Sequence, residues 1–309
     1  MLLDEELAPY APHRPSVCTI GVFDGVHVGH QALVRRTIEE ARGRGHSSGV
    51  VVFHPHPRDV LVPGTHVPVL TPLEDRVRLL KDLGADVVVP VSFTLKLSKL
   101  SARQFMSSLV QHLRLAGIVS GPDFAVGKDR GGDLPALIRL GEELGYTVTV
   151  IEPLGEPARK ISSSAIRNAV GSGEVDAAAR LLGRPYSTRG KVIHGAARGR
   201  TLGYPTANLR IDAGVALPGD GIYATRARAD GSIYASASYV GSQPTFNGNE
   251  RSIEVFLFDF QGDLYGDDLE VEWVSKVRDD RRFDSQDALV RQMAQDVDQA
   301  RAVLASERG

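Results

Sequence analysis

Two histidines three residues apart, His27 and His30, stand in a glycine-rich segment that follows an apolar run near the N-terminus. Residues three apart share one face in the first turn of a helix, so two imidazoles there could donate hydrogen bonds to a polyphosphate. Glycines let a backbone approach a ligand, and the N–H groups at a helix N-terminus favour anions. A glycine turn with incidental histidines is the alternative. The same segment adds the nucleotide-binding candidates Gly21, Phe23, Asp24, Gly25 and Gly29.

Two later segments could complete an anion site. Residues 121–132 follow another apolar run and combine flexible glycines with basic side chains. Residues 161–167 precede a helical stretch, where serine N-capping is the simple explanation. Hydroxyl groups and an arginine at a helix start are also good phosphate ligands. The candidates from these two segments are Asp123, Lys128, Arg130, Ser163, Ser164 and Arg167.

The densest motif of the chain is residues 190–208. It consists of an apolar run, a flap rich in glycine and arginine, and a strand that we expect to begin at Pro205. Such a flap can cover a polyphosphate with inward-pointing backbone N–H groups. Thr206 and Asn208 would face the same side of a strand, and with phosphate oxygens and water they could bind Mg²⁺. A basic surface loop before an edge strand is the alternative. The segment's nucleotide-binding candidates are Gly195, Arg198, Gly199, Gly203 and Pro205.

One carboxylate is placed to act as a general base. Strand alternation puts Glu254 on the same face as Phe256 and Phe258, where an acid is unusual without a partner or a task. The chain has no P-loop motif, and a hydroxyl is a poor nucleophile until a base removes its proton. An acid at the solvent edge of a barrel is the alternative explanation.

The elements that would position the first group of candidates alternate in type. Apolar runs at 17–21, 50–53, 87–91, 118–120 and 147–151 indicate strands, and the amphipathic segments between them indicate helices. This alternation predicts a doubly wound, Rossmann-like parallel sheet. Because ligands of such sheets bind at the carboxyl ends of the strands, the loops carrying the histidines and the later anion-binding candidates should converge.

The second half of the chain has a different pattern. Short alternating strands separated by glycine-rich turns predict a small antiparallel barrel of the Greek-key type, closed by a helix that begins near Ser285. Asp230 and Gly231 predict one hairpin turn, and a second hairpin is expected around residues 262–266. The change of pattern places the domain boundary after Gly183, which gives domains 1–183 and 184–309.

Composition narrows the class of protein. The chain has 309 residues, a formal net charge of −2 and one cysteine, Cys18. This charge argues against a nucleic-acid partner bound through a broad basic surface. A single cysteine excludes an intramolecular disulfide and fits a reducing compartment. The N-terminus lacks the pattern of a signal peptide, and no apolar stretch is long enough to span a membrane. We therefore expect a cytoplasmic protein without a membrane partner.

The motifs, in this order, resemble a known family. Residues 21–30 (GVFDGVHVGH), 123–128 and 161–167 are similar to the FAD synthetase branch of the nucleotidyltransferases. The flap, residues 205–208 (PTAN), the strand of Glu254 and residues 262–266 are similar to riboflavin kinases. From about residue 19 to 303 the chain thus resembles the bifunctional bacterial riboflavin kinase/FAD synthetase family.

The resemblance implies an α/β nucleotidyltransferase domain followed by a riboflavin kinase barrel. It implies phosphorylation of riboflavin to FMN and adenylylation of FMN to FAD, with ATP and Mg²⁺ as co-substrates. His27 and His30 would hold ATP phosphates, and Glu254 would be the base. Thr206 and Asn208 would bind Mg²⁺–ATP, and the flavin contacts would be Arg278 and Phe124. The expected partners are these small molecules, and a homo-oligomer is one option for the assembly.

Three positions depart from the family pattern: His54 replaces an acid, Tyr239 an asparagine and Gln243 a basic residue. His54 leaves open a riboflavin kinase with an impaired adenylyl half, and a regulatory protein that binds flavin or nucleotide without catalysis is a further alternative. The pair His54 and His56 could also suggest a metal site, although the prolines around it favour a rigid loop.

Overall fold

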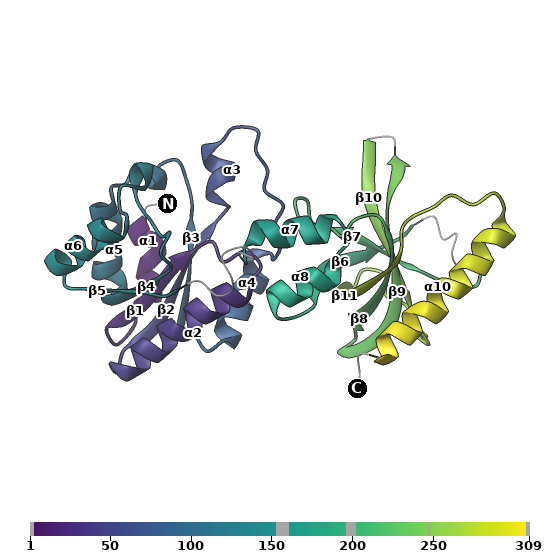
Figure 1. Ribbon diagram of the computed structural model, residues 1–309, viewed down its shortest axis with the longest axis horizontal. Helices are drawn as coiled ribbons and strands as arrows, with labels where there is room; N and C mark the ends of the chain where they lie inside the picture. The colour runs from purple at the N-terminus through teal and green to yellow at the C-terminus, as the bar shows by residue number, and fades with distance from the viewer. Residues whose placement is uncertain (1–2, 153–160, 196–201, 246–247, 307–309) are drawn as a thin grey trace. The chain divides into compact units, whose positions relative to one another are not determined.

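The computed structural model describes residues 3–152, 161–195, 202–245 and 248–306, with the side chains of 242–250 excepted (Figure 1). The chain forms two compact units, Met1–Ser163 and Ser164–Gly309. The residues between 164 and 183 are thus grouped with the second unit, and the predicted domain boundary after Gly183 stays a prediction.

A parallel sheet of five strands forms the centre of the first unit, in the order β3-β2-β1-β4-β5. The predicted doubly wound fold is confirmed. The order reverses between β1 and β4, and at such a switch point the carboxyl ends of two neighbouring strands flank a crevice. The strands are β1 (Ser16–Gly21), β2 (Ser47–His54), β3 (Val87–Ser92), β4 (Leu115–Ser120) and β5 (Thr147–Val150).

Helices cover both faces of this sheet (Figure 1). One face buries valines of β2 and β3 against α2 and α4, and the other buries Ile20 and Ile118 against α1, α5 and α6. The helices are α1 (Leu3–Leu7), α2 (Val28–Gly43), α3 (Pro57–Leu61), α4 (Leu73–Asp82), α5 (Ala102–Leu113) and α6 (Leu134–Leu144), with 3-10 turns η1 (Ala8–Tyr10), η2 (Leu97–Lys99) and η3 (Lys128–Arg130). The five-residue helices α1 and α3 are too short to show a helical period in the sequence.

The second unit is a closed antiparallel barrel in the order β10-β7-β6-β11-β8-β9, preceded by two helices and followed by a long one. The predicted barrel and terminal helix are confirmed. The elements are α7 (Ser163–Gly171), α8 (Val175–Leu182), β6 (Tyr186–Ile193), β7 (Ala207–Ile211), β8 (Gly221–Ala229), β9 (Ser232–Thr245), β10 (Gly248–Leu257), β11 (Asp268–Arg278) and α10 (Gln286–Ser306).

Alternate residues of the barrel strands face its interior or its outer surface. Ile253 and Val255 of β10 are buried in the interior, whereas Phe256 and Phe258 lie on the outer surface, where α10 packs against the barrel (Figure 1). Residue 254 therefore lies on the outer side together with Phe256 and Phe258, whose face strand alternation predicts it to share.

One of the two predicted hairpins is confirmed. Ala229 pairs with Ser232 across Asp230 and Gly231, whose φ values of 48° and 75° suit the two-residue turn of a right-twisted hairpin. The hairpin expected around residues 262–266 is wrong. In the barrel order β10 lies between β7 and β9, and β11 between β6 and β8. The ten residues between β10 and β11 instead form part of a cavity wall.

No helix among the residues described above is long and apolar enough to cross a membrane.

Candidate active sites

The turn between β1 and α2 positions the two histidines. Phe23, Gly25 and Val26 have φ values of 53°, 84° and 41°. The left-handed region suits glycine but is strained for a β-branched residue such as Val26. The Val26 N–H donates to the Phe23 carbonyl at 3.0 Å, and Gln31 Nε2 donates to the Val26 carbonyl at 3.0 Å. Backbone strain of this kind persists only where the surroundings fix it, and it often marks a functional site.

His27 is the N-cap of α2, and this role fixes its tautomer. Its Nδ1 accepts the backbone N–H of His30 at 3.2 Å, so the proton of the neutral ring is on Nε2, which is therefore a donor. The His27 and His30 rings stack with centroids 3.5 Å apart and planes at 16°. The sequence thus predicted correctly that the two imidazoles lie together at a helix start.

The His30 ring is kept uncharged. Burial, then the neighbouring His27 and Arg76, lower the pKa of His30 well below its usual value. Its Nδ1 is buried and has no hydrogen-bond partner among the residues that the structure describes. A charged ring there would leave a buried donor unsatisfied, which costs free energy. Burial of His30 therefore makes the stability of the first unit depend on pH.

The free energy of unfolding should fall in acid because of His30. Its folded pKa lies below the unfolded value of about 6.5, so below pH 6.5 the unfolded state binds more protons than the folded state. Stability is full above this pH and should decrease as pH falls, by at most about 1.4 kcal/mol per unit. Urea unfolding between pH 7.5 and 5.5, followed by circular dichroism, should give a shallower pH dependence for His30→Asn than for the unsubstituted chain. Equal slopes would contradict this assignment.

Two glycines of the turn make room for the site's own rings. A Cβ on Gly21 would lie 3.2 Å from the Phe23 ring, and one on Gly29 would lie 3.3 Å from two ring atoms of His27. The sequence assigned these glycines to ligand approach. In the structure they allow Phe23 and His27 to pack against the turn, and a direct nucleotide contact at Gly21 or Gly29 stays a prediction.

Asp24 is buried and its carboxylate is engaged by the protein. It accepts the backbone N–H groups of Leu70 and Thr71, both at 3.0 Å, and pairs with Arg76 Nη2 at 3.5 Å. The sequence placed Asp24 among the nucleotide-binding candidates, and that contact stays a prediction. Sequence reasoning did not single out Arg76.

The structure brings Ser163 of the serine segment to the histidine turn. The Ser163 hydroxyl donates to the Asp24 carbonyl at 2.8 Å, which joins residues 139 positions apart. The Ser163 hydroxyl thus makes a contact outside its own helix. Ser164 and Arg167 follow on α7 in the second unit. Their contacts with a nucleotide stay predictions.

The loop after β4 holds two exposed basic side chains. Lys128 and Arg130 are exposed, and Arg130 Nη2 donates to the Asp123 carbonyl at 2.8 Å. Phe124 is half-buried and packs against the core between the sheet and α5. Phe124 therefore has a packing role in the fold, and its predicted contact with flavin stays untested.

His54 lies at the carboxyl end of β2 as a neutral imidazole. Burial and then Arg76 lower its pKa, against an opposing contribution from Asp24. His56 is the N-cap of α3, with its Nδ1 accepting the Arg58 N–H at 3.1 Å. The rigid-loop interpretation of the histidine pair fits this geometry. In the described parts of the chain, no three His, Cys, Asp or Glu side chains are grouped as a metal site.

The second site is a row of polar side chains across three barrel strands. The register pairs Glu254 of β10 with Asn208 of β7 on one side and with Tyr239 of β9 on the other. Antiparallel partners point to the same face. The Thr206 hydroxyl donates to Glu254 Oε2 at 3.0 Å. The structure therefore brings together the three residues that the sequence had proposed as base and metal ligands.

The expected start of the strand at Pro205 is wrong, because β7 begins at Ala207. Proline has no N–H to give to the ladder, so the pairing starts after it. Thr206 consequently stands just before the strand, where its hydroxyl reaches the carboxylate of Glu254.

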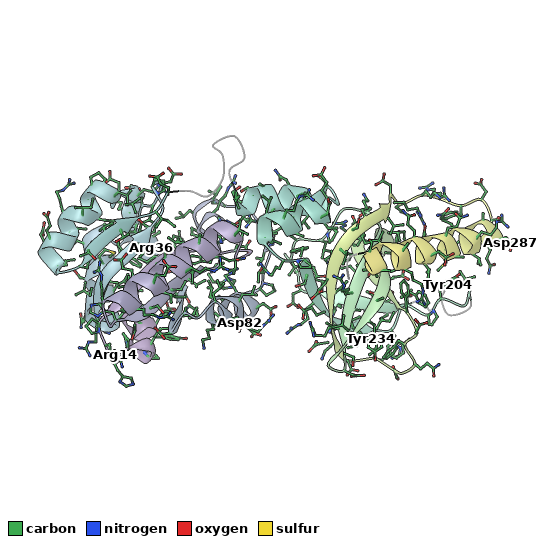
Figure 2. All side chains as sticks on the ribbon, turned by 60° about the horizontal axis from the view of Figure 1, so that its bottom comes forward. Arg14, Arg36, Asp82, Tyr204, Tyr234 and Asp287 are labelled. Atoms are coloured by element: carbon green, nitrogen blue, oxygen red, sulfur yellow. The ribbon has the colours of Figure 1, made fainter. Side chains whose placement is uncertain are left out.

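An open cavity of about 550 Å³ lies beside Thr206 and Asn208. Its wall includes Phe256, whose ring meets Tyr204 edge to face with centroids 5.4 Å apart (Tyr204 is labelled in Figure 2). Tyr265 also lines the cavity and stacks on His194 at 3.8 Å. Aromatic walls with a few convergent polar groups are typical of a small-molecule site, and the volume suits a ligand of nucleotide size.

The absence of a side chain at Gly195 leaves room for the Asn208 amide. A Cβ on Gly195 would lie 2.4 Å from the amide carbon and nitrogen of Asn208. Gly195 and Pro205 also line the cavity, and Gly203 has a φ of 85°. The other two predicted flap residues, Arg198 and Gly199, lie outside the described residues. Nucleotide contacts of all five stay predictions.

The substitution Gly195→Ala should therefore displace the Asn208 amide. If this amide is a ligand of Mg²⁺–nucleotide, the KM for that co-substrate in FMN formation should rise by about tenfold, as for the loss of one charge-assisted contact. The measurement is a titration of Mg²⁺–ATP at saturating riboflavin. Gly171→Ala, at the end of α7 where a Cβ meets no atom within 4 Å and φ is not left-handed, is the control. An unchanged KM in Gly195→Ala would argue against Asn208 as a ligand.

Arg278 is held by a buried acid that the sequence did not reveal. Asp296 of α10 accepts from Arg278 Nε at 2.9 Å and from Nη2 at 2.7 Å. The guanidinium also lies 5.6 Å from the centre of the Phe283 ring. A bidentate pair fixes the plane of a guanidinium. Arg278 thus joins the end of β11 to α10, and its predicted contact with flavin stays a prediction.

The fold and the two sites define a class of protein. The first unit combines a doubly wound sheet with a histidine pair at a helix N-terminus. The second combines a barrel with an acid beside a threonine and an asparagine. Together these features are typical of a transferase with two nucleotide-dependent sites. Comparison with known proteins specifies the class further. The FAD synthetase family model matches residues 10–165, and the riboflavin kinase family model matches residues 182–304.

Curated relatives match over nearly the whole chain. Bifunctional riboflavin kinase/FMN adenylyltransferases are 36% identical in Listeria monocytogenes, 38% in Bacillus subtilis and 37% in Escherichia coli K12. These alignments cover 92–94% of this chain and 91–92% of the relatives. A solved Streptococcus pneumoniae structure described as a macrolide-efflux protein is 34% identical, with a TM-score of 0.88 and 96% of each chain covered. The chain belongs to the family of bifunctional riboflavin kinase/FMN adenylyltransferases.

Proposed function

We propose that this chain makes FAD from riboflavin in two steps: the barrel phosphorylates riboflavin to FMN, and the α/β unit adenylylates FMN. ATP is the co-substrate of both steps. The observation that carries the proposal is the contact of Thr206 with Glu254, opposite Asn208 and beside the cavity. The stacked His27 and His30 at the start of α2 support the second step.

In the kinase step, a primary hydroxyl of riboflavin attacks the γ-phosphorus of ATP. The new O–P bond forms as the bond to ADP breaks, and the hydroxyl proton moves to the Glu254 carboxylate. A base is needed because the hydroxyl is a weak nucleophile. The hydrogen bond from Thr206 fixes the orientation of that carboxylate.

The donors at the barrel site fit Mg²⁺. Neutral oxygens of Thr206 and Asn208 could supply part of a hard-cation shell, with water and phosphate oxygens completing it. The close fit of Gly195 against Asn208 leaves the amide one well-defined place. When bound, the ion would neutralise phosphate charge. Thr206 and Asn208 are the residues that would hold it.

In the adenylyl step, an oxygen of the FMN phosphate attacks the α-phosphorus of ATP, and pyrophosphate leaves. A phosphate monoester is already ionised, so no base or covalent intermediate is required. Positioning and charge stabilisation then supply the rate. The Nε2–H of His27, the His30 ring and the backbone N–H groups of Val28 and Gly29 in the first turn of α2 are the groups for this task.

One assay tests the proposal. The purified chain is incubated with riboflavin, ATP and Mg²⁺, and the flavins are separated by chromatography. Formation of FAD is the expected result. FMN alone would favour a kinase whose adenylyl half is impaired, and unchanged riboflavin would favour a binding protein. A cytoplasmic location and the absence of nucleic-acid and membrane partners remain predictions, and so does the oligomeric state.

A further inference from the structure

A buried arginine lies behind the adenylyl site and is not part of the residues proposed to bind nucleotide. Arg76 is 2% exposed and stands in the first turn of α4 (Leu73–Asp82). A cation near a helix N-terminus opposes the helix dipole, so helix stability does not explain this residue. Burying its guanidinium also carries a desolvation cost. Both costs point to a task outside α4.

The guanidinium of Arg76 joins three segments of the first unit. Its Nη1 donates to the carbonyl of Val22 at 2.8 Å, in the turn after β1, and approaches that of Phe53 in β2 at 3.5 Å. Its Nη2 donates to the carbonyl of Thr71 at 3.0 Å. The planar fork of arginine can serve several acceptors at once, whereas the single ammonium of lysine cannot do so in the same geometry.

Asp24, within the histidine turn, is the acidic partner of Arg76. Its carboxylate pairs with Arg76 Nη2 at 3.5 Å and accepts the N–H groups of Leu70 and Thr71. Both side chains are almost fully buried. A buried ion pair of this kind is often no more stabilising than an apolar pair of equal volume. Its presence is therefore better explained by what it positions.

The positioned element is the strained turn that carries the histidines. Phe23 and Val26, which are not glycines, have left-handed φ values on either side of Asp24. Such a turn needs its surroundings to hold it. Arg76 holds it through the Val22 carbonyl, and Asp24 ties it to residues 70–71. The next residues along the chain are His27, which caps α2, and His30, which stacks on it.

The charge of Arg76 also acts on nearby imidazoles. It contributes, after burial, to the lowered pKa of both His30 and His54. His54 follows Phe53, whose carbonyl Arg76 approaches. The geometry and the charge thus both act on His30.

We propose that Arg76, together with Asp24, is a positioning residue for adenylyl transfer: it fixes the turn that aims His27 and His30 at the ATP phosphates without contacting substrate itself. This inference rests on the proposed function. It moves Asp24 from the nucleotide-binding set to the residues that act through others.

The test uses the full chain and two substitutions. Arg76→Lys keeps the charge but loses the fork, and Arg76→Met keeps most of the side-chain volume but loses the charge. Arg78→Met, on the exposed side of the same helix, is the matched control. FAD formation from supplied FMN and FMN formation from riboflavin are measured in each. The second rate reports on the barrel and should stay within about twofold in every variant.

For Arg76→Met we expect kcat of FAD formation to fall about a hundredfold, as for a misplacement of about 1 Å, and for Arg76→Lys about tenfold. The KM for FMN should change by less than about threefold, because binding groups are retained. Arg78→Met should match the unsubstituted chain. Histidine NMR should show the pKa of His54 rising in Arg76→Met, since one cause of its lowering is removed, and staying low in Arg76→Lys.

Two results would overturn the inference. If both Arg76 variants kept kcat within about threefold, Arg76 would position nothing that the reaction uses. If both variants lost FAD formation and also lost the cooperative unfolding transition of the first unit, the role of Arg76 would be confined to the stability of the core. Failure of the proposed function is distinguishable, because the unsubstituted chain would then form no FAD from FMN.

Discussion

Glu254→Gln should abolish FMN formation and leave FAD formation from supplied FMN intact. Glutamine keeps the size of the side chain and can still accept the hydrogen bond of Thr206, but it cannot take a proton. A positioned general base contributes about 10²–10⁴ in rate, so kcat of the kinase step should fall by that factor. The measurement is FMN formation from riboflavin under saturating Mg²⁺–ATP.

The control for Glu254→Gln is another barrel acid. Glu272 lies on β11 in a surface ion pair with Arg228, away from the Thr206 contact, and Glu272→Gln should keep both activities. If Glu254→Gln lost FAD formation from FMN as well, while remaining folded, the assignment of the two steps to two sites would be wrong. Retention of FMN formation would remove Glu254 as the base.

The double substitution His27→Ala with His30→Ala should have the opposite effect. It removes two ring systems at the start of α2, one of which is the helix cap. Loss of a preorganised donor to developing charge costs about 10²–10³ in kcat, and the pair should cost at least this much. FAD formation from FMN should fall accordingly, and FMN formation from riboflavin should be retained.

His13→Ala is a suitable control, because His13 is an exposed histidine of the same unit. It should leave both rates unchanged. The imidazoles would not be the phosphate-binding groups if the double variant kept FAD formation within about threefold of the unsubstituted chain. Loss of the His27 cap should cost only about 1 kcal/mol of helix stability, so the double variant should keep its helices. Circular dichroism checks this and separates a loss of catalysis from a loss of the helix.

The sequence predicted those parts of the molecule that depend on local pattern. The alternation of apolar runs and helical segments gave the doubly wound sheet, and Asp230 with Gly231 gave a hairpin turn. Period-two spacing also placed Glu254 on the same strand face as Phe256, which the structure shows to be the outer face. These features follow from side-chain periodicity and turn chemistry, which are properties of neighbouring residues.

The parts that failed depend on contacts between distant segments. The hairpin expected around residues 262–266 is absent because the strands before and after it pair with other partners in the barrel. The buried ion pairs of Arg76 and Asp296 cannot be read from local pattern, since a buried ion pair is defined only when its partner arrives from elsewhere in the chain. An arginine in the first turn of a helix, against the dipole, is the one clue that sequence alone could have offered for Arg76.

The most direct test of two separable sites is complementation in one tube. Neither Glu254→Gln nor the His27→Ala, His30→Ala double variant should convert riboflavin to FAD by itself. The first should leave riboflavin unchanged, and the second should stop at FMN. Mixed with ATP and Mg²⁺, they should restore FAD formation, because FMN released by one variant is the substrate of the other. A mixture that forms no FAD, although each variant retains its own half-reaction, would contradict the account.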